Sequence, residues 1–368
     1  MKFNIKRKKA GMSIPKFNTL LLILLSFFYL QSNSTLSIII ITIPLVMEVM
    51  FIVMNVHSIS GKNSVFIGIA IIIYTVFTQL LLINNAECLS FVFSVLYFIL
   101  AHNSIRYLSK EDMLFFSKLL LIFGIVLLTM DTIWRFTHPV YSDFYTGVYW
   151  FYRYKSKGIL FVDTNNTGML CLAILSFLLY LNNKLNIKFR KITLVYIILL
   201  VLTFSRSSLL AYALTIVFLN KRFPKYLKVL AFLGGCYVAF LLLPSLFDDV
   251  STSSKFDMFL NAVEYWKEAS LFEILFGVGF TNSIYKIGLF THSWPLTFTF
   301  EFGFLGFLLI VLFWYLMYKE SNKSAAYVLI PCLFAGLSYL PLLIPYVYTL
   351  VVIITMLEKK KEALAFVN

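Results

Sequence analysis

The chain has 368 residues, of which 60% are hydrophobic and only 13% are charged, and its mean hydropathy is +0.87. Apolar runs of about 15 to 22 residues recur from Leu20 to Leu357, which excludes a soluble domain and indicates a polytopic membrane protein. The formal net charge of +14 is compatible with nucleic-acid binding, but the Lys and Arg residues cluster in short loops between the apolar runs. That placement favours membrane topology over a nucleic-acid partner.

The apolar runs predict an all-α fold with about twelve transmembrane helices, in a single multi-spanning membrane domain over residues 1–368. The first run follows a basic segment, as in a signal peptide, but no small-residue cleavage site follows it, so we expect a retained helix. An even number of spans places both termini on one side of the bilayer. The predicted spans are 17–31, 35–56, 64–83, 87–102, 113–133, 164–181, 192–205, 207–220, 228–244, 295–318, 324–340 and 343–357.

The Lys and Arg residues near the span ends give the orientation, because such residues stay in the cytoplasm. On the side of the termini lie 22 of the 31, eight lie on the opposite side, and Lys118 lies inside a predicted span. We therefore expect cytoplasmic termini. Two long segments, 134–163 and 245–294, then lie outside, and we expect function on that outer face.

The first outer segment, 134–163, combines aromatic residues with the cations Arg135, Arg153 and Lys155. Aromatic residues in such a segment are typical of the interfacial belt of a membrane protein. They are equally suited to stack on sugar rings while the cations bind phosphate, and the sequence leaves both interpretations open. The eleven aromatic residues are Trp134, Phe136, Tyr141, Phe144, Tyr145, Tyr149, Trp150, Phe151, Tyr152, Tyr154 and Phe161.

Arg206 lies between two short apolar runs and has no acidic residue near it in the sequence. A guanidinium at membrane depth is costly unless an anion or a wet cavity accompanies it. Arg206 is therefore either an ordinary residue of a turn between two helices or a ligand for a diphosphate, which arginine binds through forked hydrogen bonds.

The second outer segment, 245–294, contains a predicted amphipathic helix from Lys255 to Ala269, capped by Ser253 and Ser254. Most such helices serve packing or lie at an interface, but a helix over the outer mouth would also shape a substrate cavity. The predicted apolar stripe consists of Phe256, Phe259, Leu260, Val263 and Trp266.

His292 closes the second outer segment directly before a predicted span, and Glu301 follows nine residues later inside that span. A lone histidine is usually structural, whereas a histidine beside a carboxylate at the mouth of a site is suited to act as a general base. Both interpretations stay open, because Trp294 and Pro295 make the local backbone hard to foresee from sequence.

The glycines near this pair and the cysteines of the chain limit the chemistry. Residues 277–279 predict a tight turn, and Gly303 with Gly306 predicts close helix packing. Neither GxGxxG nor GxxxxGK occurs here, so a phosphate-binding glycine loop is not expected. The four cysteines have no paired spacing, and no metal-ligand spacing occurs, so we expect neither a disulfide nor a metal site.

Three groups of residues resemble the O-antigen polymerase and O-antigen ligase superfamily of bacterial envelope enzymes, in their order and in their placement between spans. The resemblance covers roughly residues 158–310, and the number of spans agrees over the rest. It implies a GT-C-like membrane glycosyltransferase with a large outer loop, in the bacterial inner membrane and with its active site facing the periplasm. The groups are residues 158–168, residues 202–207, and the pattern Gly277-Val278-Gly279, His292-Ser293, Glu301-Phe302-Gly303, Gly306.

This resemblance also implies a substrate and a mechanism. The family acts on glycans carried by undecaprenyl diphosphate, and its turn arginine and loop histidine match Arg206 and His292. A hydroxyl of one lipid-linked oligosaccharide would attack the anomeric carbon of another, with His292 accepting the proton, Glu301 orienting it and Arg206 stabilising the diphosphate. No metal or other cofactor is needed, because the donor arrives activated. We expect further substrate contacts from Arg135, Arg153, Lys155, Asp163, Asn165 and Lys286.

Three functions stay open from the sequence. The first is an O-antigen polymerase, which joins repeat units and would have a chain-length regulator protein as a partner. The second is an O-antigen ligase, which transfers the glycan from the same donor to lipid A core. The third is a flippase for the lipid-linked oligosaccharide, which the lack of repeated halves disfavours. The aromatic content and the individual character of the loops favour the polymerase.

Overall fold

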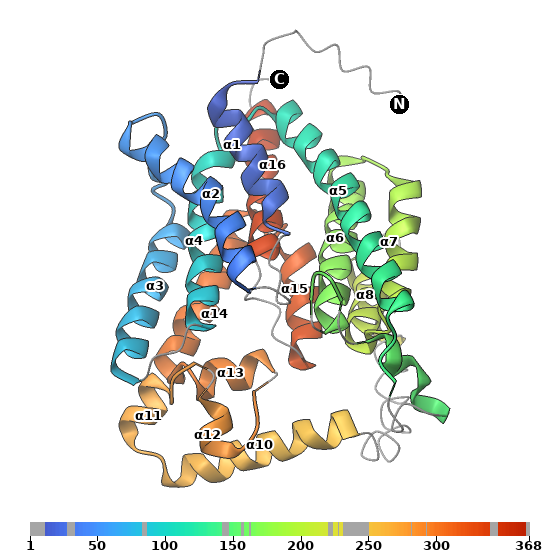
Figure 1. The fold of residues 1–368 in the computed structure, drawn as a ribbon. Coiled ribbons are helices and arrows are strands. Elements are labelled where there is room, and N and C mark those ends of the chain that lie inside the picture. The colour runs from blue at the N-terminus through green and yellow to red at the C-terminus, as the bar shows by residue number, and fades with distance from the viewer. Residues whose placement is uncertain are drawn as a thin grey trace.

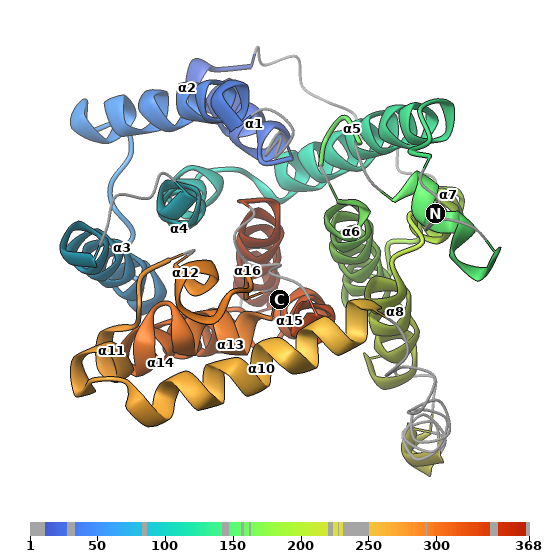
Figure 2. The same ribbon diagram turned by 60° about the horizontal axis from the view of Figure 1, so that its bottom comes forward.

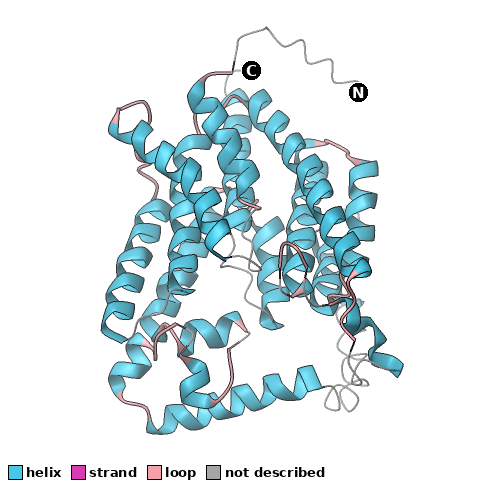
Figure 3. Cartoon of the chain, in the orientation of Figure 1, coloured by secondary structure: helices cyan, strands magenta, loops and turns pink. Residues whose placement is uncertain are grey.

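The protein is helical throughout the part of the chain that the structure describes, and no strand occurs in that part (Figure 3). The predicted all-α fold is therefore confirmed. The predicted span 228–244 lies almost entirely outside the described residues. The computed structural model describes residues 12–27, 34–82, 87–141, 147–155, 158–161, 163–219, 224–226, 228–230, 250–280, 282–291, 293–338 and 345–365.

The helices form a bundle, and Figures 1 and 2 show α10 crossing one end of it, from α11 and α12 towards α8. The first half of the chain forms α1 (Ile14–Leu25), α2 (Ser34–Val53), α3 (Asn63–Leu82), α4 (Glu87–Ile105), α5 (Lys110–Thr137), the 3-10 helix η2 (Gly147–Tyr154) and α6 (Thr164–Leu185). The second half forms α7 (Arg190–Leu202), α8 (Arg206–Leu219), α10 (Val250–Glu268), α11 (Leu271–Phe276), α12 (Ser283–Ile287), α13 (Trp294–Phe300), α14 (Gly303–Glu320), α15 (Ala326–Ala335), the 3-10 helix η3 (Gly336–Ser338) and α16 (Pro345–Ala365).

Three of the described helices, α5, α6 and α14, are long and apolar enough to cross a membrane, with 28, 22 and 18 residues. At about 1.5 Å per residue such helices match a hydrocarbon core of about 30 Å. Six further apolar helices are shorter in their described parts. These lengths suggest a membrane protein, and the total of twelve spans stays a prediction.

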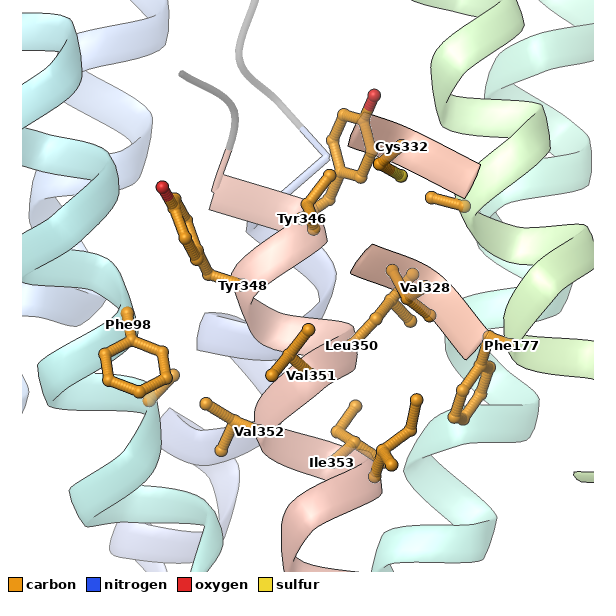
Figure 4. Packing of buried hydrophobic residues seen from close by; sticks show 14 of the residues in the cluster. Phe98, Phe177, Val328, Cys332, Tyr346, Tyr348, Leu350, Val351, Val352 and Ile353 are labelled. Carbon is orange, nitrogen blue, oxygen red and sulfur yellow. The ribbon is translucent and has the colours of Figure 1, made fainter. Parts of the chain in front are cut away.

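The C-terminal helix α16 lies in the middle of the core. Every residue from 345 to 358 is buried, and α16 packs against α4, α5, α6, α14 and α15. Figure 4 shows Tyr348 and Val352 on the side of α16 that faces Phe98 of α4, and Ile353 on the side of Phe177 of α6. A helix that is apolar all round is stable when other helices cover every face, which this central position provides.

Polar contacts join several helix ends and the loops next to them at one end of the bundle. The ammonium of Lys16 pairs with Asp112 at 2.7 Å, and the Lys361 ammonium donates to the carbonyl of Lys184 at 3.2 Å. The ammonium of Lys360 donates to the carbonyl of Leu108. The Lys and Arg count placed all these loops on one side, so the structure groups them as the sequence did. Which side of a membrane this end faces stays a prediction.

The predicted span 295–318 is broken in the structure. Helix α13 ends at Phe300, α14 begins at Gly303, and Gly303 takes a φ of 70°. A left-handed residue cannot continue an α-helix, so the chain turns there. Glu301 therefore caps the end of α13 and does not lie inside a continuous span, which corrects the sequence prediction.

Helix α10 corrects the predicted cap and shows which of its residues pack. It begins at Val250, so Ser253 and Ser254 lie inside the helix and do not cap it. Its buried face carries Met258 and Ala262, which pack with α12 and α13. Of the stripe that was predicted to serve packing or an interface, Trp266 packs against this cluster, while Phe256, Phe259 and Leu260 are largely exposed at 49%, 52% and 47%.

Candidate functional site

A tight turn presents Arg206 at the same end of the bundle as α10. Helix α7 ends at Leu202, and Phe204 in the turn has a left-handed φ of 54°. The hydroxyl of Thr203 accepts the amide of Ser205 at 3.2 Å and helps to hold this conformation. Arg206 is the first residue of α8, and its side chain is exposed. The predicted turn between two helices is confirmed.

Two of the resembling segments pack directly against each other at this turn. A Cβ atom added to Gly168 of α6 would lie 2.6 Å from the Cβ of Ser205 and 3.0 Å from the hydroxyl of Ser208. Real Cβ atoms essentially never approach so closely, so only glycine allows α6 to come this near. The segment 158–168 and the segment 202–207 therefore form one structural unit.

A buried ion pair holds this unit in place. Asp131 and Arg135 lie one turn apart on α5, with 3.1 Å between Oδ2 and Nε and both side chains fully buried. Asp131 Oδ1 also accepts the amide of Leu160, while Arg135 Nη1 donates to the carbonyls of Tyr154 and Leu202. Arg135 thus connects the ends of η2 and α7 to α5 through hydrogen bonds. This positioning role differs from the predicted substrate contact, because the buried guanidinium is engaged with the protein.

Two cations meet on Tyr152, and we call Tyr152, Lys155 and Arg206 the Tyr152 junction. Arg206 Nη2 donates to the Tyr152 hydroxyl at 3.2 Å, and the Lys155 ammonium lies 5.0 Å from the centre of the same ring. Next to them, the Arg153 guanidinium lies 5.5 Å from the ring centre of Tyr141. Three of the predicted substrate-binding or catalytic cations thus share one region, each beside an aromatic ring.

Described aromatic residues of the first outer segment show both packed and exposed rings. Phe136, Trp150 and Phe151 surround Phe204, with ring centres 5.9 to 6.2 Å away, so they support the strained turn. Tyr141 is 75% exposed, and Trp150 exposes half of its surface as well. Phe136 and Phe151 thus serve packing, Trp150 both packs and stays half exposed, and Tyr141 offers the exposed ring that both the interfacial belt and sugar stacking require.

Glu301 lies in a second group, the Glu301 corner, formed with Thr291 and Thr297. The carboxylate is 2% exposed, and its Oε1 accepts the Thr291 hydroxyl at 2.6 Å. The Thr297 hydroxyl donates to the Thr291 carbonyl at 3.1 Å, which fixes the chain next to α13. His292 itself lies outside the described residues. Its neighbour in the chain, Thr291, is held directly against Glu301.

Gly277 and Gly279, both with positive φ, contact the backbone of Glu301. Gly277 has a φ of 81°, and a Cβ added there would lie 2.3 Å from the carbonyl oxygen of Glu301. The amide of Gly279 donates to the same carbonyl at 3.0 Å. Two parts of the resembling pattern, 277–279 and 301–303, are thus adjacent, and the predicted tight turn at Gly277 is confirmed.

Lys286, a predicted substrate ligand, forms an ion pair within the second outer segment. Its ammonium lies 3.3 Å from Glu273 Oε1, which also accepts the Tyr265 hydroxyl at 2.6 Å. Glu273 further forms a capping box with Ser270 at the start of α11. The Tyr265 hydrogen bond and then the Ser270 amide lower the pKa of Glu273 to about 2. Hydrogen bonding to Tyr265 and Glu273 raises the pKa of Lys286.

Acid should weaken the second outer segment through Glu273. The pKa of Glu273 is lower in the folded protein than its ordinary 4.5, so its stabilising contribution is present above pH 4.5 and is lost as the pH falls towards about 2. The effect is modest, because Glu273 is 25% and Lys286 40% exposed and solvent screens the pair. Thermal unfolding of the wild type and of Glu273→Gln between pH 6 and pH 3 measures this, with Glu264→Gln as the exposed control. Equal pH dependence in all three proteins would contradict the prediction.

Asp163 and Asn165 have a structural task at the start of α6. Asp163 caps the helix, since its Oδ1 accepts the Asn165 amide at 2.9 Å, and the Asn165 side chain donates to Oδ2 at 3.0 Å. Both side chains are half-buried. Contact of either residue with substrate stays a prediction.

The Tyr152 junction and the Glu301 corner are linked through α15. The indole of Trp294, the first residue of α13, donates to the carbonyl of Leu333 in α15 at 2.9 Å. Helix α15 packs against α8, whose first residue is Arg206. One helix therefore sets the relative position of the two groups.

Three residues of the site were missed in the sequence. Asp131 had a signal, because a carboxylate four residues before Arg135 in a helix predicts an ion pair. Thr291 and Glu273 had none, since their partners are distant in the chain or belong to a loop. Tyr152 was named among the aromatic residues, but its contact with Arg206 was not foreseen.

Comparison with known proteins adds no family to this description, since no protein-family model and no curated protein matches the chain. The candidate site therefore depends on the contacts above and on the motif resemblance.

Proposed function

We propose that the protein is an O-antigen polymerase, a glycosyltransferase that joins undecaprenyl-diphosphate-linked oligosaccharide repeat units. In this proposal about twelve helices cross a bacterial inner membrane, both termini are cytoplasmic, and the end with α10 to α13 faces the periplasm. A chain-length regulator protein is a further partner. The observation that carries the proposal is the Tyr152 junction, because Arg206 and Lys155 meeting on one phenol suit a polyanionic diphosphate.

The Tyr152 junction would bind the leaving group. Arg206 Nη2 is held at the Tyr152 hydroxyl, and the Lys155 ammonium approaches from the ring face, so both cations are oriented before substrate arrives. Charges fixed in advance stabilise the transition state without reorganisation. As the bond between the anomeric carbon and the diphosphate oxygen breaks, the negative charge that develops on the diphosphate is neutralised here.

The Glu301 corner would serve the attacking hydroxyl. The acceptor oxygen forms the new glycosidic bond to the anomeric carbon and releases its proton to His292, the residue next to Thr291. Glu301, buried and bonded to the Thr291 hydroxyl, would orient the imidazole and stabilise its charged form. The products are a lengthened glycan on one carrier and a free undecaprenyl diphosphate.

Removing the Arg206 guanidinium should lower the polymerisation rate about 100-fold, as expected for one donor that stabilises transition-state charge. Arg206→Lys should retain part of the activity, because it keeps the charge and loses the fork. Tyr152→Phe should cost only about fivefold, since it removes one orienting hydrogen bond. The measurement is glycan length in a host without its own polymerase, together with the rate on purified lipid-linked oligosaccharide.

Lys267→Ala is the matched control, because it removes an exposed cation of α10 at the same end of the bundle. Normal glycan ladders from both Arg206→Ala and His292→Ala, at equal protein levels, would refute the proposal. A deletion strain separates the alternatives: single repeats on the lipid A core indicate a polymerase, and glycan stalled on its carrier indicates a ligase. Reconstituted protein that moves the lipid-linked oligosaccharide across a bilayer without lengthening it would be a flippase.

A further inference from the structure

The end of α4 carries three side chains with buried nitrogens that lack hydrogen-bond partners among the described residues, far from the Tyr152 junction. His102 is 2% and Asn103 0% exposed. Both ring nitrogens of His102, the amide nitrogen of Asn103 and the Nε of Arg106 have no hydrogen-bond partner within the described residues. A buried donor without an acceptor costs about 1–3 kcal/mol, so such a group in a folded protein calls for a ligand or an ordered water molecule.

The three side chains belong to one short stretch at the end of α4. His102 and Asn103 lie in its last turn, and Arg106 directly follows its last residue, Ile105. Their remaining atoms are fixed by the loop after α2: Asn103 Oδ1 accepts the amide of Ser60 at 2.8 Å, and Arg106 Nη2 donates to the Ser58 hydroxyl at 2.5 Å. The free donors are therefore held in place by the groups beside them.

Positive charge surrounds the same turn. The charges of Lys359, Arg106 and Lys62 all act on His102, and those of Lys62 and Arg106 act on Lys359. Burial of the ammonium and then the charge of Lys62 lower the pKa of Lys359 to about 8. Arg106 after α4, Lys359 of α16 and Lys62 before α3 thus bring three positive charges to this end of the bundle, and an anion between them would reduce the repulsion on Lys359.

Three carboxylates at this end interact with other groups. Glu320, which also acts on Lys359, accepts the amide and the hydroxyl of Ser64 at 3.0 and 2.6 Å. Glu48 pairs with His57 at 2.7 Å, and Glu358 accepts the Ser324 hydroxyl. Three donors without partners among the described residues thus lie near three cations, while Glu320, Glu48 and Glu358 interact with other groups.

We propose that the last turn of α4 is a binding site for a phosphate-type oxyanion, formed by His102, Asn103 and Arg106 with Lys62 and Lys359. A phosphate group offers several acceptor oxygens to three donors and charge to three cations, which a water molecule cannot match. The oxyanion is either a free phosphate or the phosphate of an anionic lipid headgroup. The site lies at the end of the bundle opposite to the Tyr152 junction and does not depend on the proposed function.

Asn103→Asp is the sharpest test. It keeps the oxygen that accepts the Ser60 amide and replaces the unpartnered nitrogen with a negatively charged oxygen among the cations. The variant should bind inorganic phosphate at least about tenfold more weakly than the wild type, because a donor to a charged group is lost and a repelling charge is gained. Its thermal stability without phosphate should equal or exceed that of the wild type, since the carboxylate takes the place of the oxyanion.

Binding is measured by calorimetric titration of phosphate against chloride of equal ionic strength, with the full-length protein in phosphatidylcholine nanodiscs. Lys62→Gln should weaken binding, and Lys323→Gln, which removes an exposed cation at the same end, should not. Native mass spectrometry of protein offered phosphatidylglycerol or phosphatidylcholine separates the sources: phosphate binding in nanodiscs indicates a free oxyanion, and selective retention of phosphatidylglycerol that Asn103→Asp abolishes indicates a headgroup. Wild-type protein that binds neither, or Asn103→Asp that binds both as tightly, would overturn the proposal and leave hydration by water as the explanation.

Discussion

Replacing Asp131 with asparagine should destabilise the protein by about 3–5 kcal/mol, because it leaves the fully buried guanidinium of Arg135 without its counter-charge. The asparagine would still accept the Leu160 amide, but its nitrogen would face Arg135 Nε, donor against donor. Arg135→Met should cost a similar amount, since it strands the carboxylate and frees the carbonyls of Tyr154 and Leu202.

The double variant Asp131→Asn with Arg135→Met should be more stable than the sum of the single changes predicts, because no buried charge remains unpaired. Unfolding by sodium dodecyl sulfate in mixed micelles measures the stability of each variant. A thiol-reactive dye follows the unfolding, because Cys171 and Cys332 are fully buried in the folded protein. Asp163→Asn is the matched control. It makes the same chemical change at a half-buried helix cap, where asparagine serves as well as aspartate. Additive losses in the double variant would show that the pair is not coupled.

The sequence predicted those features of the fold that depend on local apolar content. Most of the predicted spans that fall on described residues correspond to helices, because a run of apolar residues long enough to cross a bilayer can satisfy its backbone only as a helix. Close packing at Gly306 was also predictable. A Cβ there would lie 2.9 Å from Tyr74 of α3, so a small residue in an apolar helix again marks a contact.

The sequence did not predict features that depend on backbone dihedral angles or on partners distant in the chain. Hydropathy treats residues 295–318 as one span, because the left-handed conformation of Gly303 leaves no trace in apolar content. The face of α10 that packs against the bundle also depends on distant partners. The position of α12 and α13 decides that Met258 and Ala262 are buried, while Phe256, Phe259 and Leu260 of the predicted stripe are exposed.

The candidate site shows the same division. The turn that carries Arg206 was predictable, since a polar Ser-Arg-Ser segment between two apolar runs has few other conformations. The convergence of Arg206 and Lys155 on Tyr152 was not, because it requires η2 to fold back on α8. Arg135 and Lys286 look like free outer cations in the sequence, and only the structure reveals their partners Asp131 and Glu273.

Replacing Gly303 with alanine should destabilise the protein by about 3–5 kcal/mol, well beyond the usual cost of placing an L-residue at positive φ. The added Cβ would lie 2.3 Å from the backbone nitrogen of Gly277 and 2.4 Å from the carbonyl of Leu275. Backbone atoms cannot rotate away as a side chain can. The two segments would have to separate, which breaks the hydrogen bond from the Gly279 amide to the Glu301 carbonyl.

Gly288→Ala separates strain from collision, because Gly288 has a similar φ of 74° but no atom within 4 Å of an added Cβ. It should cost only about 1–2 kcal/mol, the price of the left-handed conformation alone. The two variants then differ in their free energy of unfolding in sodium dodecyl sulfate by the free energy of the contact between 277–279 and 301–303. Equal losses would mean that the segments separate freely. A large difference, together with lost polymerisation in Gly303→Ala and normal polymerisation in Gly288→Ala, would link this contact to the placement of Glu301 and the chain at Thr291.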